Sequence, residues 1–223
     1  MKRTDSQSRT RAPRPLTDAK RSRIIAAALP LFAEQGYHGA RMDDLAATLG
    51  IAKGSIFQHF GSKEGLFLHV YKNAVRSFPK YLDVPVEVQQ LGFFEVLRYW
   101  LVRTEHLVHA DWIPYRIQLL GNYATDLPLK REINRFHLAE DPFGAVAFVR
   151  YGMERNELRQ EMEVDMMVSV MGWMVERFQD ALLVEELDPG LFRHPGSSIE
   201  KKEGRINQFL DLLQRAIGAE PKP

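Results

Sequence analysis

The sequence predicts an all-α protein, built from an N-terminal helix-turn-helix domain and a larger helical body. Apolar residues recur every three or four positions along most of the chain, and no alternating run is long enough to form a sheet. Within residues 42–60, a glycine separates two short helical segments. Charge also divides the chain, because residues 1–80 contain 14 Lys/Arg and 6 Asp/Glu, whereas residues 81–223 contain 16 and 23. A basic front on an acidic body is expected when only the front meets a polyanion.

Composition excludes several classes of protein. The chain has 223 residues, of which 45% are apolar and 26% charged, as in globular proteins of one or two domains. Cysteine is absent, which excludes disulfides and thiolate chemistry. The longest apolar run, Ile24–Ala33, is far shorter than a membrane span, and no apolar signal core precedes Pro15. We therefore expect a cytoplasmic protein with no membrane partner.

The first residues are basic and polar. We expect residues 1–16 to form a disordered arm, which either reaches along DNA phosphates or into a minor groove, or serves only as a solvated tail. A first helix is predicted from an N-cap at Thr17 to Gly36, with a local bend or 3₁₀ turn at Pro30. Its buried stripe comprises Ile24, Ala28, Leu31 and Phe32.

Residues 42–60 contain the glycine turn. The apolar positions of the first segment share one face, and Gly50 is suited to end that helix in the left-handed conformation. The second segment runs from Lys53 to Phe60, and Ile56 and Phe60 can face the first segment. Polar and basic side chains are left on its other faces. This pattern predicts a helix-turn-helix whose second helix enters a major groove.

Gly54 lies early in this second helix, where glycine costs about 1 kcal/mol relative to alanine. It is either a tolerated glycine or a point where the backbone approaches a phosphate strand closely, and the flanking Lys53 and Ser55 favour the second interpretation. Gln58 could read adenine through a bidentate hydrogen bond. The full set of candidate DNA-binding residues is Arg41, Lys53, Gly54, Ser55, Phe57, Gln58, His59 and Lys63.

The same stretch resembles the DNA-binding signature of TetR-type (TetR/AcrR) transcriptional regulators. The resemblance lies in Gly50-Ile-Ala-Lys-Gly-Ser-Ile-Phe-Gln-His-Phe60, in 62–67, and backwards through 24–37. Three positions depart from the family, which usually has Ser or Thr where Ala52 stands, Tyr where Phe57 stands and Thr where Arg41 stands. Ala52 and Phe57 lack a hydroxyl that could bond a phosphate, while Arg41 could supply a charge instead.

Residues 86–151 are rich in aromatic side chains, most of which we expect in a core. The resemblance implies in addition that these helices enclose a cavity for a small, largely apolar effector. His106 and His109 are three residues apart, but no third ligand accompanies them, so we predict no metal and no cofactor. The candidate ligand-binding residues are Trp100, Arg103, His106, Trp112, Tyr115, Arg116, Leu119 and Tyr123.

Two amphipathic helices are predicted near the C-terminus, one from about Asp165 to Glu186 and one around 206–217. Their apolar faces either pack within the monomer or, as the resemblance implies, pair with a second copy in a four-helix interface. A two-fold homodimer also suits a palindromic operator. The candidate interface residues are Met166, Val170, Trp173, Met174, Arg177, Phe178, Ala181, Phe209 and Leu213.

These observations predict a ligand-responsive DNA-binding transcriptional regulator, a repressor released from its operator by a small molecule. The expected parts are the arm (1–16), the helix-turn-helix domain (17–62), a connecting helix (63–80) and a ligand-binding and dimerisation domain (81–223). The alternative is a DNA-occlusion or chromosome-organising factor of the same fold that has no ligand. No nucleophile–base pair or phosphate loop indicates an enzyme.

Overall fold

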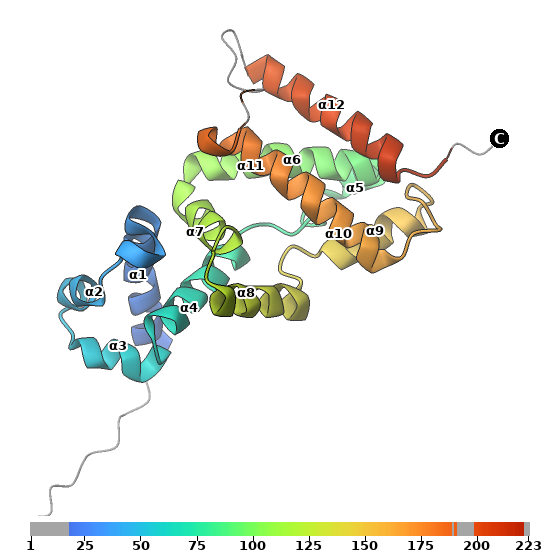
Figure 1. The fold of residues 1–223 in the computed structure, drawn as a ribbon. Coiled ribbons are helices and arrows are strands. Elements are labelled where there is room, and N and C mark those ends of the chain that lie inside the picture. The colour runs from blue at the N-terminus through green and yellow to red at the C-terminus, as the bar shows by residue number, and fades with distance from the viewer. Residues whose placement is uncertain (1–17, 189, 191–198, 221–223) are drawn as a thin grey trace, which may run out of the picture. The chain divides into compact units, whose positions relative to one another are not determined.

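The computed structural model describes residues 18–188, 190 and 199–220, and Figure 1 shows their helices. Apart from an isolated bridge between Leu158 and Gly218, these residues contain no β-structure, so the all-α prediction is confirmed. The chain divides into two compact units, Met1–Val70 and Tyr71–Pro223. The division falls inside α4 (Lys63–Arg76), in the stretch where the sequence predicts a connecting helix. The expected basic arm lies outside the described residues.

The first unit begins with α1 (Asp18–Gly39), in which Ile24, Ala28 and Phe32 are at most 1% exposed. Leu31, which the sequence placed in the same buried stripe, is only half-buried. Pro30 lies within α-helix, so the 3₁₀ turn expected there as one alternative is wrong, and a bend of the helix axis stays a prediction. Non-helical dihedral angles occur in α1 at Gly36, where φ is 70°, so the first helical run ends where the sequence indicates. Glycine adopts this angle without steric penalty, and the chain reverses there before α2.

The turn between α2 (Met42–Leu49) and α3 (Lys53–Phe60) forms as the sequence predicts. Gly50 has φ 64° and ψ 37°, which is the left-handed conformation. The Gly50 N–H donates to the Ala47 carbonyl at 3.1 Å, and the Ile51 N–H donates to the Ala46 carbonyl at 3.0 Å. These two bonds satisfy carbonyls at the end of α2 in the Schellman arrangement. They fix the direction in which the chain leaves α2 and enters α3.

An aromatic cluster holds α1 against α4. The ring of Phe67 meets Phe32 edge-on at 5.1 Å and Tyr37 at 5.3 Å between centroids. At the start of α4, the Ser62 hydroxyl accepts from the Gly65 N–H at 3.0 Å, which caps the helix as its sequence favours. Aromatic packing and the cap together set the orientation of the helix that follows α3.

The second unit consists of helices around an aromatic core. The helices are α5 (Val86–Leu91), α6 (Phe93–Ala110), α7 (Trp112–Asn122), α8 (Leu127–Glu140), α9 (Ala145–Glu154), α10 (Val164–Met171), a π-helical turn η1 (Gly172–Glu176), α11 (Arg177–Leu183), a 3₁₀ turn η2 (Glu185–Leu187) and α12 (Ile199–Ile217). In the core, Phe148 stacks on Phe93 at 4.2 Å and on Tyr81 at 4.8 Å between centroids. The predicted helix from about Asp165 to Glu186 is thus α10 and α11 joined through η1.

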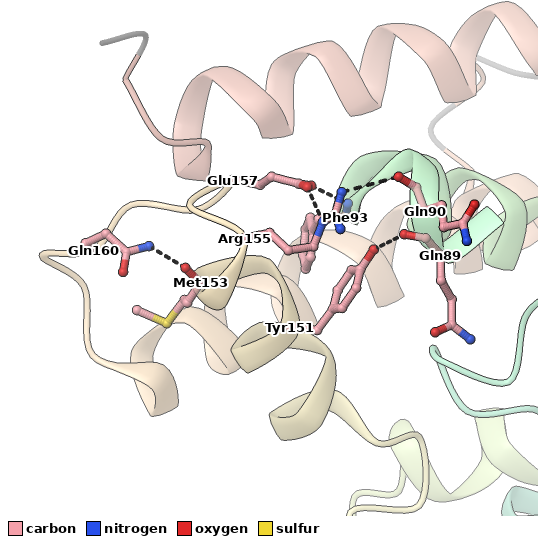
Figure 2. A network of polar contacts seen from close by, with 8 residues as sticks. All are labelled: Gln89, Gln90, Phe93, Tyr151, Met153, Arg155, Glu157 and Gln160. Atoms are coloured by element: carbon pink, nitrogen blue, oxygen red, sulfur yellow. Dashed lines mark hydrogen bonds and ion pairs between the residues drawn. The ribbon is translucent and has the colours of Figure 1, made fainter. Parts of the chain in front are cut away.

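A polar network joins the segment after α9 to the start of α6 (Figure 2). The Glu157 carboxylate accepts from the Phe93 N–H and, at 2.5 Å, from Arg155. Arg155 also donates to the Gln90 carbonyl at 3.3 Å, and the Tyr151 hydroxyl donates to a carbonyl of α5. Glu157 therefore caps α6, because its negative charge lies at the positive end of that helix.

In the described part of the chain, none of the helices has both the length and the apolar character that crossing a membrane requires.

Candidate functional site

The exposed side of α3 is the candidate nucleic-acid interface. Ile56 and Phe60 are 0% and 6% exposed and fix the inward side of the helix. Successive helical residues are about 100° apart, so Gly54 and Gln58 lie on the opposite side, one turn from each other. Both are exposed. The half-buried Ser55, Phe57 and His59 flank this ridge. The outward strip of α3 is therefore narrow and has no side chain at its first exposed position, Gly54.

Lys53 lies at the side of α3 that faces α2. Its ammonium forms an ion pair with Asp43 at 2.9 Å, with 46% and 59% of the two side chains exposed. An exposed pair of this kind contributes about 0–1 kcal/mol, so a phosphate can replace Asp43 as the partner of Lys53. Sequence reasoning missed Asp43, although an exposed acid in the first turn of the helix preceding the recognition helix was visible.

The N-terminus of α3 has no side-chain acceptor for its free amides. Ala52 occupies the N-cap position without a capping bond, and the first turn contains no acidic residue. Such a helix end attracts an anion through its partial positive charge. Arg41 stands just before α2 with an extended backbone and an exposed side chain, and its side chain makes no capping bond. Arg41 therefore remains a candidate contact by charge.

Lys63 is held within the first unit rather than extended from it. Its ammonium donates to the His38 carbonyl at 3.1 Å and lies 5.2 Å from the centre of the Tyr37 ring. Partial burial lowers the pKa of Lys63. To contact a phosphate, Lys63 would have to do so while it keeps the His38 carbonyl and the Tyr37 ring as partners, or it would have to give up the hydrogen bond to the carbonyl.

The helices of the first unit carry almost no net charge. Residues 18–70 contain six Lys/Arg and five Asp/Glu, whereas residues 1–17 contain five Lys/Arg and one Asp. The basic excess of the front therefore comes largely from the expected arm and from positions beyond Val70. DNA binding by α3 would therefore depend on contacts by individual side chains, because the net charge of residues 18–70 is close to zero.

The eight ligand-binding candidates divide between core and surface. Trp100 is buried and donates to the Pro79 carbonyl at 3.2 Å, while Arg103 donates to the Asp83 carbonyl. Exposed members of the set are His106, Trp112, Arg116 and Tyr123; buried members besides Trp100 are Tyr115 and Leu119. Of the eight, Tyr123 lines an open cleft of about 570 Å³ formed by α7, α8, α10, η1 and α11. A closed apolar chamber around all eight stays a prediction.

A buried carboxylate lies at the edge of this cleft. Asp180 is 5% exposed and accepts from the Tyr115 hydroxyl at 2.5 Å and from the Tyr123 hydroxyl at 2.6 Å. Arg177 in turn donates to the Tyr123 hydroxyl. Sequence reasoning missed both Asp180 and Glu176, although two acids four residues apart in a largely apolar helix were a visible signal.

The pKa of Glu176 is raised to about 7, first because burial disfavours its charge and then because Asp180 is nearby; Lys130 acts in the opposite direction. A carboxyl whose pKa is raised on folding stabilises the fold at low pH, and this contribution is lost as pH rises through the folded value. Water reaches the side chain, so we expect an effect of about 1 kcal/mol rather than the full shift. Replacing Glu176 by Gln should therefore raise the melting temperature more at pH 8 than at pH 5.

Melting curves of Glu176→Gln and the parent chain across pH 5–8 measure this difference. The exposed Glu185→Gln is the matched control, since it removes the same charge from η2. If the melting temperatures of Glu176→Gln and the parent changed in the same way between pH 5 and pH 8, the raised pKa of Glu176 would be contradicted.

The dimer-interface candidates are exposed to different degrees. Met166 and Trp173 are 50% and 67% exposed, and Arg177 is exposed as well. Val170, Met174, Phe178, Ala181 and Phe209 are half-buried, and Phe178 stacks on Phe209 at 4.0 Å between centroids. Leu213 is 0% exposed, so its side chain packs in its own unit and has no surface for a partner. Leu212, at 59%, is the outward leucine of α12.

Comparisons with known proteins agree with the geometry of the first unit. Residues 24–70 match the family model described as "Bacterial regulatory proteins, tetR family". The HTH-type transcriptional repressor AcnR of Corynebacterium efficiens is 28% identical over 197 residues, which cover 88% of this chain and 92% of the relative.

Two solved structures show the same fold. A TetR-family transcriptional regulator from Vibrio parahaemolyticus superposes with a TM-score of 0.65 at 22% identity, covering 90% of this chain and all of that one. A transcriptional regulator from Saccharomonospora viridis, solved in complex with choline, gives 0.56 at 21% identity, covering 92% and 100%. The named relatives are transcriptional regulators, not enzymes. Residues 24–70, with their helix-turn-helix geometry, therefore resemble the DNA-binding region of the tetR family of bacterial regulatory proteins, and the described chain has the fold of solved structures of that family.

Proposed function

We propose that the chain is a homodimeric repressor that binds a palindromic operator and is released from it by a small molecule. The observation that carries the DNA-binding part is the outward ridge of α3, where Gly54 and Gln58 face solvent opposite a buried Ile56 and Phe60. A bare backbone at Gly54 allows close approach to a phosphate strand, and Gln58 can pair with adenine. The AcnR relative is a transcriptional repressor, which supports repression as the outcome of binding.

The proposed palindromic operator would need a dimer, because its two halves are bound by two recognition helices. Two recognition helices must enter successive major grooves roughly 34–36 Å apart, which requires a second copy of this chain. The exposed Met166 and Trp173 on α10 and η1, with Leu212 on α12, supply apolar surface for that copy. A ligand would act by favouring a dimer in which this spacing no longer matches the grooves.

A ligand-free occlusion factor of the same fold is the second candidate. The open cleft beside α8 and η1 favours a sensor, since about 570 Å³ is within the range of small-molecule sites. The regulator from Saccharomonospora viridis was solved in complex with choline, so a protein of similar fold holds a small molecule. Selection of bound fragments from random duplex DNA, followed by a screen for compounds that release them, tests both parts. A monomeric solution mass without retention on any duplex at low salt would refute the proposal.

Lys53→Ala tests whether Lys53, at the start of α3, contacts a phosphate. We expect weaker operator binding and a salt dependence whose logarithmic slope is flatter by about one unit, because one phosphate contact is lost. Binding should be measured by anisotropy at several salt concentrations.

Asp43→Asn is the matched comparison, because it removes the same ion pair from the other side. Asp43→Asn should tighten operator binding about two- to fivefold. Lys53 would no longer have to leave Asp43 in order to contact a phosphate, and a negative charge near the phosphates would be removed. Equal effects of the two substitutions would show that the ion pair itself, rather than Lys53, matters.

A further inference from the structure

The cleft of the second unit has a mixed lining. Apolar surface comes from Leu138 on α8 and from Trp173 on η1, whereas Ile133, also in the lining, is 1% exposed. Leu138 and Trp173 are 87% and 67% exposed, which is unusual for side chains of this size. The charged and titratable groups of the lining are Lys130, His137, Glu176, Arg177, Asp180 and Tyr123. An amphipathic molecule could meet both kinds of surface here.

Most of these polar groups already have a partner within the protein. Asp180 accepts from two tyrosines, and Arg177 donates to the Tyr123 hydroxyl. The Lys130 ammonium donates to the Asn122 carbonyl at 2.8 Å. His137 shares a hydrogen bond of 2.9 Å with the Tyr71 hydroxyl, and burial lowers its pKa, which favours the neutral imidazole. Each of these groups therefore has at least one partner within the protein, although the Lys130 ammonium and the Arg177 guanidinium keep further N–H donors.

Glu176 differs from these groups. In the part of the chain that the structure describes, its carboxylate has neither a hydrogen bond nor an ion pair, although Asp180 and Lys130 are near enough to affect its pKa. The residue lines the cleft and is exposed to solvent, while the surrounding protein still disfavours its charge and raises its pKa to about 7. A perturbed titratable group in a cleft is a recognised indicator of a binding site.

The π-helical turn contributes both Glu176 and Trp173 to the lining of the cleft. Both residues belong to η1 and both line the cleft, three positions apart. π-Helical turns are rare and occur frequently at functional sites, because they change the direction of the side chains that follow. A cation at Glu176 would meet an acidic group and an aromatic ring from the same turn, which is the combination that attracts organic ammonium groups.

We propose that this cleft binds an amphipathic organic cation, with its ammonium group at Glu176 and its apolar body against Trp173 and Leu138. The proposal rests on the proposed effector-responsive function and specifies the class of effector. Trp173 and Arg177 are also candidates for the dimer interface, so an occupant of the cleft would lie beside the surface that sets the dimer geometry. An anionic amphiphile, held by Lys130 and Arg177, is the contrary outcome.

Calorimetry with three matched probes tests the site. Octylamine, octanol and octanoate share one alkyl chain and differ in head-group charge. At pH 8 the full-length protein should bind octylamine at least tenfold more tightly than octanol, and octanoate most weakly. Tighter binding of octanoate, or no binding of any probe, would overturn the proposal.

Variants assign the effect to Glu176. Glu176→Gln should reduce octylamine affinity at least tenfold and leave octanol affinity unchanged, whereas Glu185→Gln should change neither. Octylamine binding should also strengthen from pH 6 to pH 8, because Glu176 must ionise against Asp180 to pair with the cation. Unchanged octylamine binding by Glu176→Gln would refute the assignment.

DNA retention, measured on the same samples, separates this inference from the proposed function. If octylamine binds through Glu176 but leaves operator complexes intact, the cationic site stands and ligand-induced release fails. If the operator is bound and no amine binds, the repressor stands and the cationic site is refuted.

Discussion

A Gly54→Glu variant is expected to fold as well as the parent chain and to lose about 99% of its affinity for duplex DNA. A Cβ built at Gly54 meets no atom within 4 Å, so a side chain fits there without displacing the protein. Helix propensity favours the change, because glycine costs about 1 kcal/mol in a helix. The added carboxylate lies on the outward ridge of α3, where it would face phosphates, and such like-charge juxtaposition costs several kcal/mol.

Titration of labelled operator by anisotropy, together with a thermal melt, measures both parts of this expectation. Ala139→Glu adds the same charge to an exposed position on α8 and should leave DNA affinity within about twofold. Gly54→Ala separates charge from size, since it stabilises α3 while adding a single methyl group at the surface. Should Gly54→Glu bind the operator as tightly as Ala139→Glu, α3 would not be the recognition helix.

Gly152→Ala is expected to lower the free energy of unfolding by about 1–3 kcal/mol through overpacking. A Cβ at Gly152 would lie 2.6 Å from Phe93 and 2.8 Å from Leu158. Both neighbours are 0% exposed, so neither can turn toward solvent. The helix α9 would have to move from the aromatic core that Phe93 shares with Phe148.

Urea unfolding of the purified chain measures this loss. Gly204→Ala in α12 is the control, because a Cβ there meets nothing within 4 Å, and it should stabilise by up to about 1 kcal/mol. The two substitutions should change the free energy of unfolding in opposite directions, because a Cβ is overpacked at Gly152 and meets open space at Gly204. A Gly152→Ala chain as stable as the parent would mean that α9 is held less tightly than the structure indicates.

The sequence by itself determined the helical fold and the helix-turn-helix of the first unit. Each signal there is local: Gly50 ends α2, Ser62 caps α4, and Ile56 and Phe60 mark the inward side of α3. Helix periodicity and capping depend on residues within one or two turns of each other, so they can be read along the chain. The same reasoning placed the non-helical break at Gly36.

Tertiary structure alone decided which polar groups meet and which apolar residues stay free. The Asp43–Lys53 pair spans two helices, and Tyr123 meets Asp180 across 57 positions of sequence. Leu212 and Leu213 have the same chemistry, yet they are 59% and 0% exposed because of how α12 packs. A one-residue rotation of an amphipathic helix changes such a pair without changing its periodicity. The unpaired carboxylate of Glu176 became visible only when the partners of its neighbours were known, because hydrogen-bond satisfaction belongs to the packed chain.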